Sequence, residues 1–157
     1  MNISDLLQPS AVVATLRVHG KKQLLQELAG RGATLVRLPE RKIFETLTER
    51  ERLGTTGVGQ GIAIPHGRLA DLKQITGVFA HLESPIDYDA VDGQPVDLVF
   101  MLLAPEGAGA DHLKALARVS RLLRNQQVTE KLRAAKSAEA LYAILTDTTS
   151  SSGAQAA

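Results

Sequence analysis

The sequence predicts a single α/β domain, because short apolar segments typical of strands alternate along the chain with longer segments of helical periodicity. Its length of 157 residues is that of one domain and is sufficient to bury a hydrophobic core. Hydrophobic residues make up 44% of the chain and aromatic residues only 3%, so the core must be built mainly from aliphatic side chains.

The N-terminal part holds one predicted strand and two predicted helices. Residues 12–18 form an extended pattern. A helix is expected over residues 21–32, since leucines recur there at helical spacing and Gly32 suits a helix end. A second helix should begin at Pro39, where proline is best tolerated, and stop at Gly54. Its buried face is expected to hold three apolar residues: Ile43, Phe44 and Leu47.

The next strands are short apolar segments bounded by turn residues. They are expected at residues 62–64 and 75–82, with a hairpin-like segment over 86–91. Residues 96–104 are apolar apart from Asp97, which is typical of a central strand buried on both faces.

Three helices are expected to complete the domain, at residues 111–125, 128–134 and 137–145. The first should bury five residues: Leu113, Leu116, Ala117, Ser120 and Leu123. From Asp147 onward the chain has nothing to bury, so we expect a domain over residues 1–146 and a disordered tail over 147–157.

Charge and cysteine content argue against several classes of function. The formal net charge is +1, which gives no basic field to attract nucleic acid or a membrane surface. There is no cysteine, and hence neither a disulfide nor thiolate chemistry. The N-terminus lacks the pattern of a signal peptide, and no apolar run reaches membrane-spanning length. We therefore expect a cytoplasmic protein that neither binds nucleic acid nor inserts into a membrane.

Segment 54–68 is the most informative stretch of the chain. Four glycines punctuate its first half, a short apolar run follows, and His66 is held between Pro65 and Gly67. Pro65 fixes its own φ and favours an extended Ile64, while Gly67 lets the chain turn away. We expect a strand whose end presents the imidazole at the mouth of a glycine-rich loop.

Each part of this segment also has a bland interpretation. A lone histidine in a loop is more often solvated than reactive, and an arginine such as Arg50 is favoured near any helix C-terminus. The glycine loop has neither the Lys-Ser/Thr ending of a P-loop nor the spacing of a dinucleotide fingerprint, which argues against nucleotide binding. The combination favours chemistry: Arg50 before the loop, His66 after it, and the pair Asp111-His112 far downstream.

Residues 47–68, and above all the Ala-Ile-Pro-His-Gly core, resemble the active-site segment of the fructose/mannitol-type enzyme IIA domains. These domains belong to the bacterial phosphoenolpyruvate-dependent phosphotransferase system, and the likeness is closest to its nitrogen-regulatory branch. It continues through residues 78–79, 87–103 and 132–137 and covers nearly the whole chain except the tail. The resemblance implies a mixed β-sheet with α-helices packed on both sides.

Histidine suits phosphoryl acceptance, because its neutral imidazole offers an unprotonated nitrogen at neutral pH without a separate base. Catalysis is then mostly positioning and electrostatic stabilisation of the transferred group. The resemblance implies that His66 accepts the group on Nε2, that Arg50 stabilises it and that His112 orients it. Further phosphate-binding groups are expected nearby: Thr55, Thr56, Gly57, Gly59, Gly61 and Arg68. Neither a cofactor nor a metal is implied.

Three functions remain open from the sequence. The first is a regulatory phosphohistidine relay, whose donor is by resemblance an HPr-like phosphocarrier and whose targets are proteins such as potassium transporters or sensor kinases. The second is a stand-alone transport component that passes the phosphoryl group to a IIB protein for uptake of fructose- or mannitol-type sugars. The third, much less favoured, is a metal-dependent hydrolase built on His66, His112 and Asp111.

Overall fold

The computed structural model describes residues 1–147, so the predicted tail lies, from residue 148 on, outside the described residues. The strands are β1 (Val12–Leu16), β2 (Gly57–Gly59), β3 (Ile62–Ala63), β4 (His66–Leu69), β5 (Thr76–Ile86) and β6 (Val96–Pro105). The helices are α1 (Ile3–Leu6), the 3-10 turn η1 (Pro9–Ala11), α2 (Lys21–Val36), α3 (Glu40–Arg52), α4 (Gly109–Arg124), α5 (Gln126–Ala134) and α6 (Ala138–Leu145).

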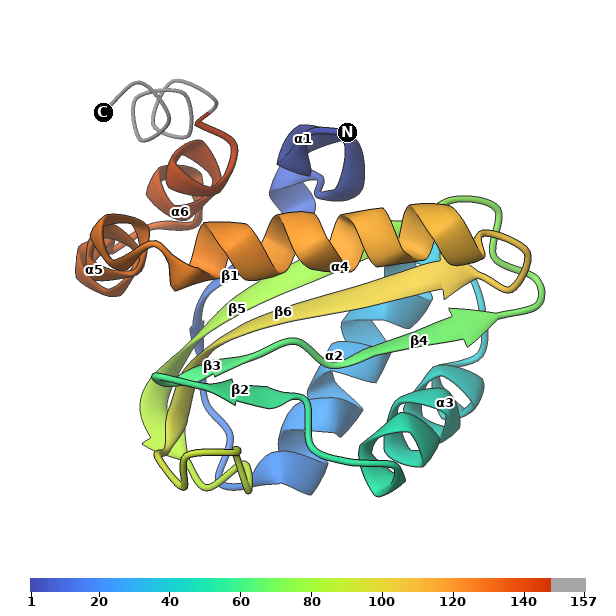
Figure 1. The fold of residues 1–157 in the computed structure, drawn as a ribbon, viewed down its shortest axis with the longest axis horizontal. Helices are drawn as coiled ribbons and strands as arrows, with labels where there is room; N and C mark the ends of the chain where they lie inside the picture. Colours follow the sequence, from blue (N-terminus) through green and yellow to red (C-terminus); the bar gives the residue numbers. More distant parts are fainter. Residues whose placement is uncertain (148–157) are drawn as a thin grey trace.

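The six strands form one mixed sheet in the order β1-β5-β6-β3-β2, with β4 also pairing β6. Strand β5 runs antiparallel to β6 and parallel to β1, whereas β3 and β4 both run parallel to β6. Helix α4 covers one face and α2 the other (Figure 1). The predicted mixed α/β fold with helices on both sides is therefore confirmed.

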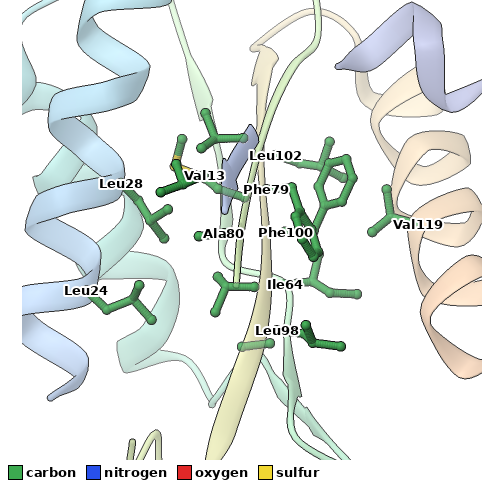
Figure 2. Packing of buried hydrophobic residues seen from close by; sticks show 14 of the residues in the cluster. Val13, Leu24, Leu28, Ile64, Phe79, Ala80, Leu98, Phe100, Leu102 and Val119 are labelled. Atoms are coloured by element: carbon green, nitrogen blue, oxygen red, sulfur yellow. The ribbon is translucent and has the colours of Figure 1, made fainter. Parts of the chain in front are cut away.

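Strand β6 forms the centre of the core. Its residues from Leu98 to Ala104 are fully buried, which confirms a strand covered on both faces. Figure 2 shows the two sides: Leu24 and Leu28 of α2 pack from one, and Val119 of α4 packs from the other, with Phe79 and Phe100 between. The phenylalanine rings meet edge to face with centroids 6.2 Å apart.

The end of α2 and the start of α3 differ from the prediction. Helix α2 does not end at Gly32 but continues to Val36 and closes at Arg37, which adopts the left-handed conformation with φ 58°. Gly32 serves packing instead, because a Cβ there would come within 3.1 Å of Met101 and 3.2 Å of Leu103 in the sheet. Pro39 is the residue that precedes α3 rather than its first helical residue, and α3 ends at Arg52.

The predicted buried face of α4 was wrong except at Leu123, which is buried as expected. The buried residues of this helix are His112, Ala115, Val119 and Leu123. Leu113, which the pattern placed in the core, is 64% exposed. The helix is rotated so that His112 rather than Leu113 faces the sheet. A prediction that places the apolar residues in the core cannot find this orientation.

The segment after β5 also differs from the prediction. Residues 86–91 do not form a hairpin; Ile86 ends β5, and the following residues connect β5 to its antiparallel neighbour β6. The last two helices were predicted well, and the Ser137 side chain caps α6 by accepting a hydrogen bond from the Ala140 N–H.

Candidate functional site

His66 is the first residue of β4, beside the central strand. It pairs in register with Leu102 of β6, and the Leu102 N–H donates to the Pro65 carbonyl. The chain arrives through β3, whose Ile62 and Ala63 pair with the same strand. The expected position at the end of the strand over residues 62–64 is thus replaced by the start of a further strand, β4, and the sheet itself carries the imidazole.

Gly67 is required for helix α3 to approach this strand. A Cβ at Gly67 would lie 2.5 Å from Cγ2 of Thr46 in α3, a distance that real side chains do not tolerate. The close contact brings the last turn of α3, with Arg50, next to His66. The predicted role of Gly67 as a turn residue is therefore replaced by one in packing.

Both ring nitrogens of His66 are engaged. Nδ1 lies 2.8 Å from the Ile64 carbonyl oxygen, which can only accept, so Nδ1 carries the proton. Nε2 accepts a hydrogen bond of 3.2 Å from Nε of Arg50. The Arg50 guanidinium is itself held by a 2.8 Å bond from Nη1 to the Gly54 carbonyl. In this tautomer the lone pair of His66 is on Nε2 and points towards a cation.

His112 on α4 has the opposite arrangement. Its Nδ1 accepts a 3.1 Å hydrogen bond from Nε of Arg68, so the proton is on Nε2. The residue is 3% exposed, and Nε2 is buried without a hydrogen-bond partner among the described residues. A buried donor left unpaired is costly, so this N–H is available to an acceptor that enters the cavity.

The two histidines lie side by side, with ring centroids 5.5 Å apart and the rings inclined by 70°. They open into a cavity of about 670 Å³ between α3, β4 and α4. Arg50 and Arg68 line it together with both imidazoles. The remaining lining residues are Thr46, Glu49, Arg52, Leu53, Gly67, Leu113 and Leu116.

Both imidazoles are held in the neutral form. Burial lowers the pKa of His66, and the charges of Arg50 and Arg68 lower it further, against the opposing effects of the Ile64 carbonyl and Glu51. Burial, followed by the neighbouring His66 and Arg68, lowers the pKa of His112 to about 4. At neutral pH the two histidines therefore present one unprotonated nitrogen and one neutral N–H donor, beside the two guanidinium groups that hydrogen-bond to them. This set can accept and hold a dianionic tetrahedral group.

Comparison with known proteins identifies the family. The sequence model of "Phosphoenolpyruvate-dependent sugar phosphotransferase system, EIIA 2" matches residues 5–148. The chain belongs to this family. Among curated relatives, a nitrogen regulatory protein of Bradyrhizobium diazoefficiens is 59% identical over 145 residues, 92% of this chain and 95% of the relative. A nitrogen regulatory protein of Escherichia coli is 41% identical over 149 residues, 94% of this chain and 91% of the relative.

Solved structures agree with this assignment. The crystal structure of nitrogen regulatory protein IIA-Ntr from Neisseria meningitidis matches with a TM-score of 0.88 and 42% identity, over 92% of this chain and 99% of that one. The IIA mannitol structure from Escherichia coli matches with a TM-score of 0.74 at 18% identity, over 88% and 97% of the two chains, and shows the shared fold alone. The resemblance to the nitrogen-regulatory branch of the EIIA family is therefore confirmed.

In this EIIA chain the structure gathers four of the predicted site residues at one cavity: His66, His112, Arg50 and Arg68. The other five, Thr55, Thr56, Gly57, Gly59 and Gly61, do not line it. Thr55 Oγ1 accepts from the Gly57 N–H, and Thr56 is buried in a separate polar cluster. The expectation that the glycine loop forms the mouth of the histidine site is therefore not met.

The glycines instead shape a β-hairpin. Gly59, Gln60 and Gly61 all have positive φ and form the tight turn between β2 and β3. The turn is held from outside, because Asp92 accepts from the Gln60 N–H and Arg133 donates to the Gln60 carbonyl. The turn needs residues that adopt positive φ, and glycine does so readily. The spacing of the glycines alone did not distinguish such a turn from a phosphate-binding loop.

Sequence reasoning missed the apolar rim of the cavity. Leu53 is 84% exposed and Leu113 is 64% exposed, and both line the opening. Leu53 could have been predicted at the rim, because it lies three residues after Arg50 and residues at that spacing share a helix face. Leu113 was missed because it had been assigned to the core.

Three further observations bear on metal binding and on membrane insertion. No group of three or more histidine, cysteine, aspartate or glutamate side chains within residues 1–147 is arranged to hold a metal ion. Asp111 lines a different cavity from the two histidines, so the three side chains of the hydrolase hypothesis do not converge. Within the same residues, no helix is both long enough and apolar enough to cross a membrane.

Proposed function

We propose that this EIIA chain is a phosphohistidine relay protein that accepts a phosphoryl group on Nε2 of His66. The observation that carries the proposal is the protonation pattern of the site. Nδ1 of His66 donates to the Ile64 carbonyl, which leaves the lone pair on Nε2, beside Arg50 and inside the cavity. A nucleophile of this kind needs no separate base.

The transfer balances without a further reactant. The Nε2 lone pair of His66 forms a bond to phosphorus, the bond between phosphorus and the donor nitrogen breaks, and its electron pair returns to the donor imidazole. His66 keeps its Nδ1 proton, and the Ile64 carbonyl stabilises the positive charge that develops on the ring. Arg50, displaced from Nε2 by the incoming group, then donates to its equatorial oxygens.

His112 and Arg68 act as a second pair. Arg68 occupies Nδ1 of His112, so the buried Nε2–H remains available to donate to a phosphoryl oxygen on His66. The low pKa of His112 keeps this group neutral, which avoids placing a third cation against the two guanidiniums. The phosphoryl group would thereby pair with a donor that has no partner within residues 1–147 of the unmodified protein.

An HPr-like phosphocarrier is the proposed donor, as its place in a phosphotransferase system requires. The nitrogen regulatory proteins that match this chain over most of their length support a regulatory role, exercised through the phosphorylation state of His66. Targets would be cytoplasmic or membrane-bound proteins such as potassium transporters or sensor kinases, contacted from the cytoplasm. In this role the chain is a phosphotransferase component rather than an enzyme with a diffusible product.

Sugar uptake through a IIB protein is the second candidate. It is favoured by similarity to a fructose-specific EIIABC component of Bacillus subtilis, 34% identical over 146 residues, which cover 92% of this chain and 23% of that protein. The same histidine would pass on its phosphoryl group. We rank this candidate second, because the identity to nitrogen regulatory proteins is higher.

Intact mass spectrometry tests the proposal. The protein is incubated with phosphoenolpyruvate, enzyme I and HPr, with His66→Ala as the matched variant. We expect an acid-labile gain of one phosphoryl group that is lost in His66→Ala. No gain in the wild-type protein, or an undiminished gain in the variant, would overturn the proposal. Transfer from the labelled protein to an added IIB protein would then separate the two candidates.

A further inference from the structure

Glu51 is a buried carboxylate immediately after Arg50, in the last turn of α3. Its side chain is only 7% exposed. It accepts from the Thr56 backbone N–H at 3.0 Å and from the Thr56 hydroxyl, and it pairs with Lys21 Nζ at 2.9 Å. Three donors thus compensate the buried charge, which would otherwise be strongly unfavourable.

The cluster joins three separate parts of the chain. The Thr56 hydroxyl gives its proton to Glu51 and accepts from the Tyr88 hydroxyl, 2.8 Å away. Burial, followed by the charge of Glu51, raises the pKa of Tyr88, which keeps the phenol protonated and able to donate. Lys21 lies over the Tyr88 ring, 4.5 Å from its centroid. The start of α2, the end of α3 and the segment after β5 meet at one carboxylate.

From this cluster a path of hydrogen bonds leads to His66. The Thr56 carbonyl accepts from the Ile64 N–H at 3.0 Å. The Ile64 carbonyl in turn accepts from Nδ1 of His66 at 2.8 Å. On the other side of the imidazole, Nε2 accepts from Arg50, whose neighbour in the chain is Glu51.

The path therefore closes into a ring: Glu51, Thr56, Ile64, His66 and Arg50. Both contacts that determine the His66 tautomer are members of it. The link between Arg50 and Glu51 is the peptide chain itself, and the hydrogen bonds connected in this way strengthen one another.

We propose that Glu51 is a positioning residue for phosphoryl transfer, holding Ile64 and Arg50 at the two nitrogens of His66 so that the lone pair stays on Nε2. The inference rests on the proposed function and assigns no contact between Glu51 and the phosphoryl group. Glu51 does not line the cavity, and it acts only through Thr56 and through its neighbour Arg50.

The test compares Glu51→Gln with Glu45→Gln. Glu45 lies on the same helix in an exposed ion pair with Arg41, so its variant removes a like charge without touching the ring. Nitrogen-15 NMR of the unmodified protein reports the His66 tautomer, and transfer kinetics report the rate at saturating HPr. We expect Glu51→Gln to lower the Nδ1–H population and to slow the saturated rate about ten- to a hundredfold, with little change in the half-saturating HPr concentration. Glu45→Gln should change neither.

A second pair keeps the test valid if Glu51→Gln folds poorly. Thr56→Val removes the hydroxyl bonds to Glu51 and Tyr88, whereas Thr56→Ser retains them. We expect the tautomer shift and the slower rate in the valine variant and their recovery in the serine variant. An unchanged His66 tautomer in both Glu51→Gln and Thr56→Val would overturn the inference, as would an effect confined to HPr binding.

The two proposals fail in distinguishable ways. The tautomer is measured without phosphorylation, so it tests the ring even if the wild-type protein accepts no phosphoryl group. Absence of transfer to the wild-type protein would refute the relay. Normal transfer to the wild type and to folded Glu51→Gln would leave the relay intact and remove Glu51 from it.

Discussion

The two histidines of the cavity form similar pairs with opposite outcomes. Each accepts a hydrogen bond from Nε of an arginine, His66 from Arg50 and His112 from Arg68. At His66 the bond reaches Nε2 and the Ile64 carbonyl holds the proton on Nδ1. At His112 the bond reaches Nδ1, and Nε2–H remains buried without a partner among residues 1–147.

The difference teaches that residue type and partner do not assign a role at this site. The role of each histidine depends on which ring nitrogen accepts the bond from arginine, because that nitrogen carries the lone pair and the other carries the proton. The carbonyl of Ile64, in the link between β3 and β4, supplies the deciding contact at His66, whereas the arginine alone supplies it at His112. One imidazole is thereby a nucleophile and the other a donor.

The largest effect should follow removal of the nucleophile. His66→Ala is expected to abolish phosphoryl acceptance while leaving the fold intact, because it removes the imidazole whose unprotonated Nε2 lies beside Arg50 at the cavity. Intact mass after incubation with the phosphorylated donor measures the result. His19→Ala, at an exposed position outside the site, is the control. Persistent labelling of His66→Ala would mean that His112 can exchange roles with it.

Loss of Arg50 should slow transfer more than loss of Arg68, because Arg50 contacts the nucleophile His66 and Arg68 contacts His112. Arg50→Ala is expected to slow transfer by well over tenfold, since one preorganised contact to developing charge is typically worth roughly 2–4 kcal/mol. Arg68→Ala should have a smaller effect, because Arg68 acts mainly by fixing the His112 tautomer. Single-turnover rates measure both, with the exposed Arg41→Ala as the control. Equal effects of Arg50→Ala and Arg68→Ala on the rate would contradict the different roles assigned to the two arginines.

His112→Gln should slow transfer about tenfold, the typical consequence of losing one hydrogen bond to a charged group. It should also flatten the pH dependence of stability. Between the ordinary value of 6.5 and the folded pKa of about 4, the unfolded chain binds a proton that folded His112 does not. The free energy of unfolding therefore falls as the pH drops through this range.

Urea titrations at several pH values measure that dependence. Wild-type protein should lose roughly 1–3 kcal/mol more than His112→Gln between pH 6.5 and 4. The matched control is His19→Gln, at an exposed position. Identical slopes for wild type and His112→Gln would show that His112 protonates normally in the folded state.

The smallest effect on transfer is expected in the glycine hairpin. Gly61 has φ +81°, and an added Cβ would meet Arg133 at 2.6 Å and Asp97 at 2.9 Å. Gly61→Ala should therefore reduce stability by about 1–3 kcal/mol while leaving the transfer rate unchanged. Thermal unfolding and transfer kinetics measure the two, with Gly107→Ala, in open space, as the control. If Gly61→Ala slowed transfer without loss of stability, the hairpin would have to be counted as part of the phosphate-binding site.

Much of the fold was predictable because it follows from local pattern. The apolar run over residues 96–104 gave the central strand, and the apolar periodicity of α5 and α6 located both helices. Gly32 shows the limit: the same residue suits a helix end and a close approach to a sheet, and only tertiary packing against Met101 distinguishes the two.

Part of the site was predictable from a sequence motif rather than from local apolar pattern. His66, Arg50 and His112 came from a motif and a family resemblance, and the structure brings them to one cavity with Arg68. The tautomers were beyond the sequence, because they depend on bonds such as that from Arg68 to His112, 44 residues apart. Glu51 was missed for the same reason, since its partners Lys21 and Thr56 belong to other elements.

The most direct test of this account locates the phosphoryl group on a ring nitrogen. Protein labelled with nitrogen-15 in its histidines is phosphorylated through HPr, and couplings between phosphorus-31 and the ring nitrogens are measured. We predict a phosphoryl group on Nε2 of His66, with Nδ1 of that ring still protonated and His112 unmodified. A phosphoryl group on Nδ1 of His66, or on His112, would contradict the assignment of opposite tautomers to the two histidines.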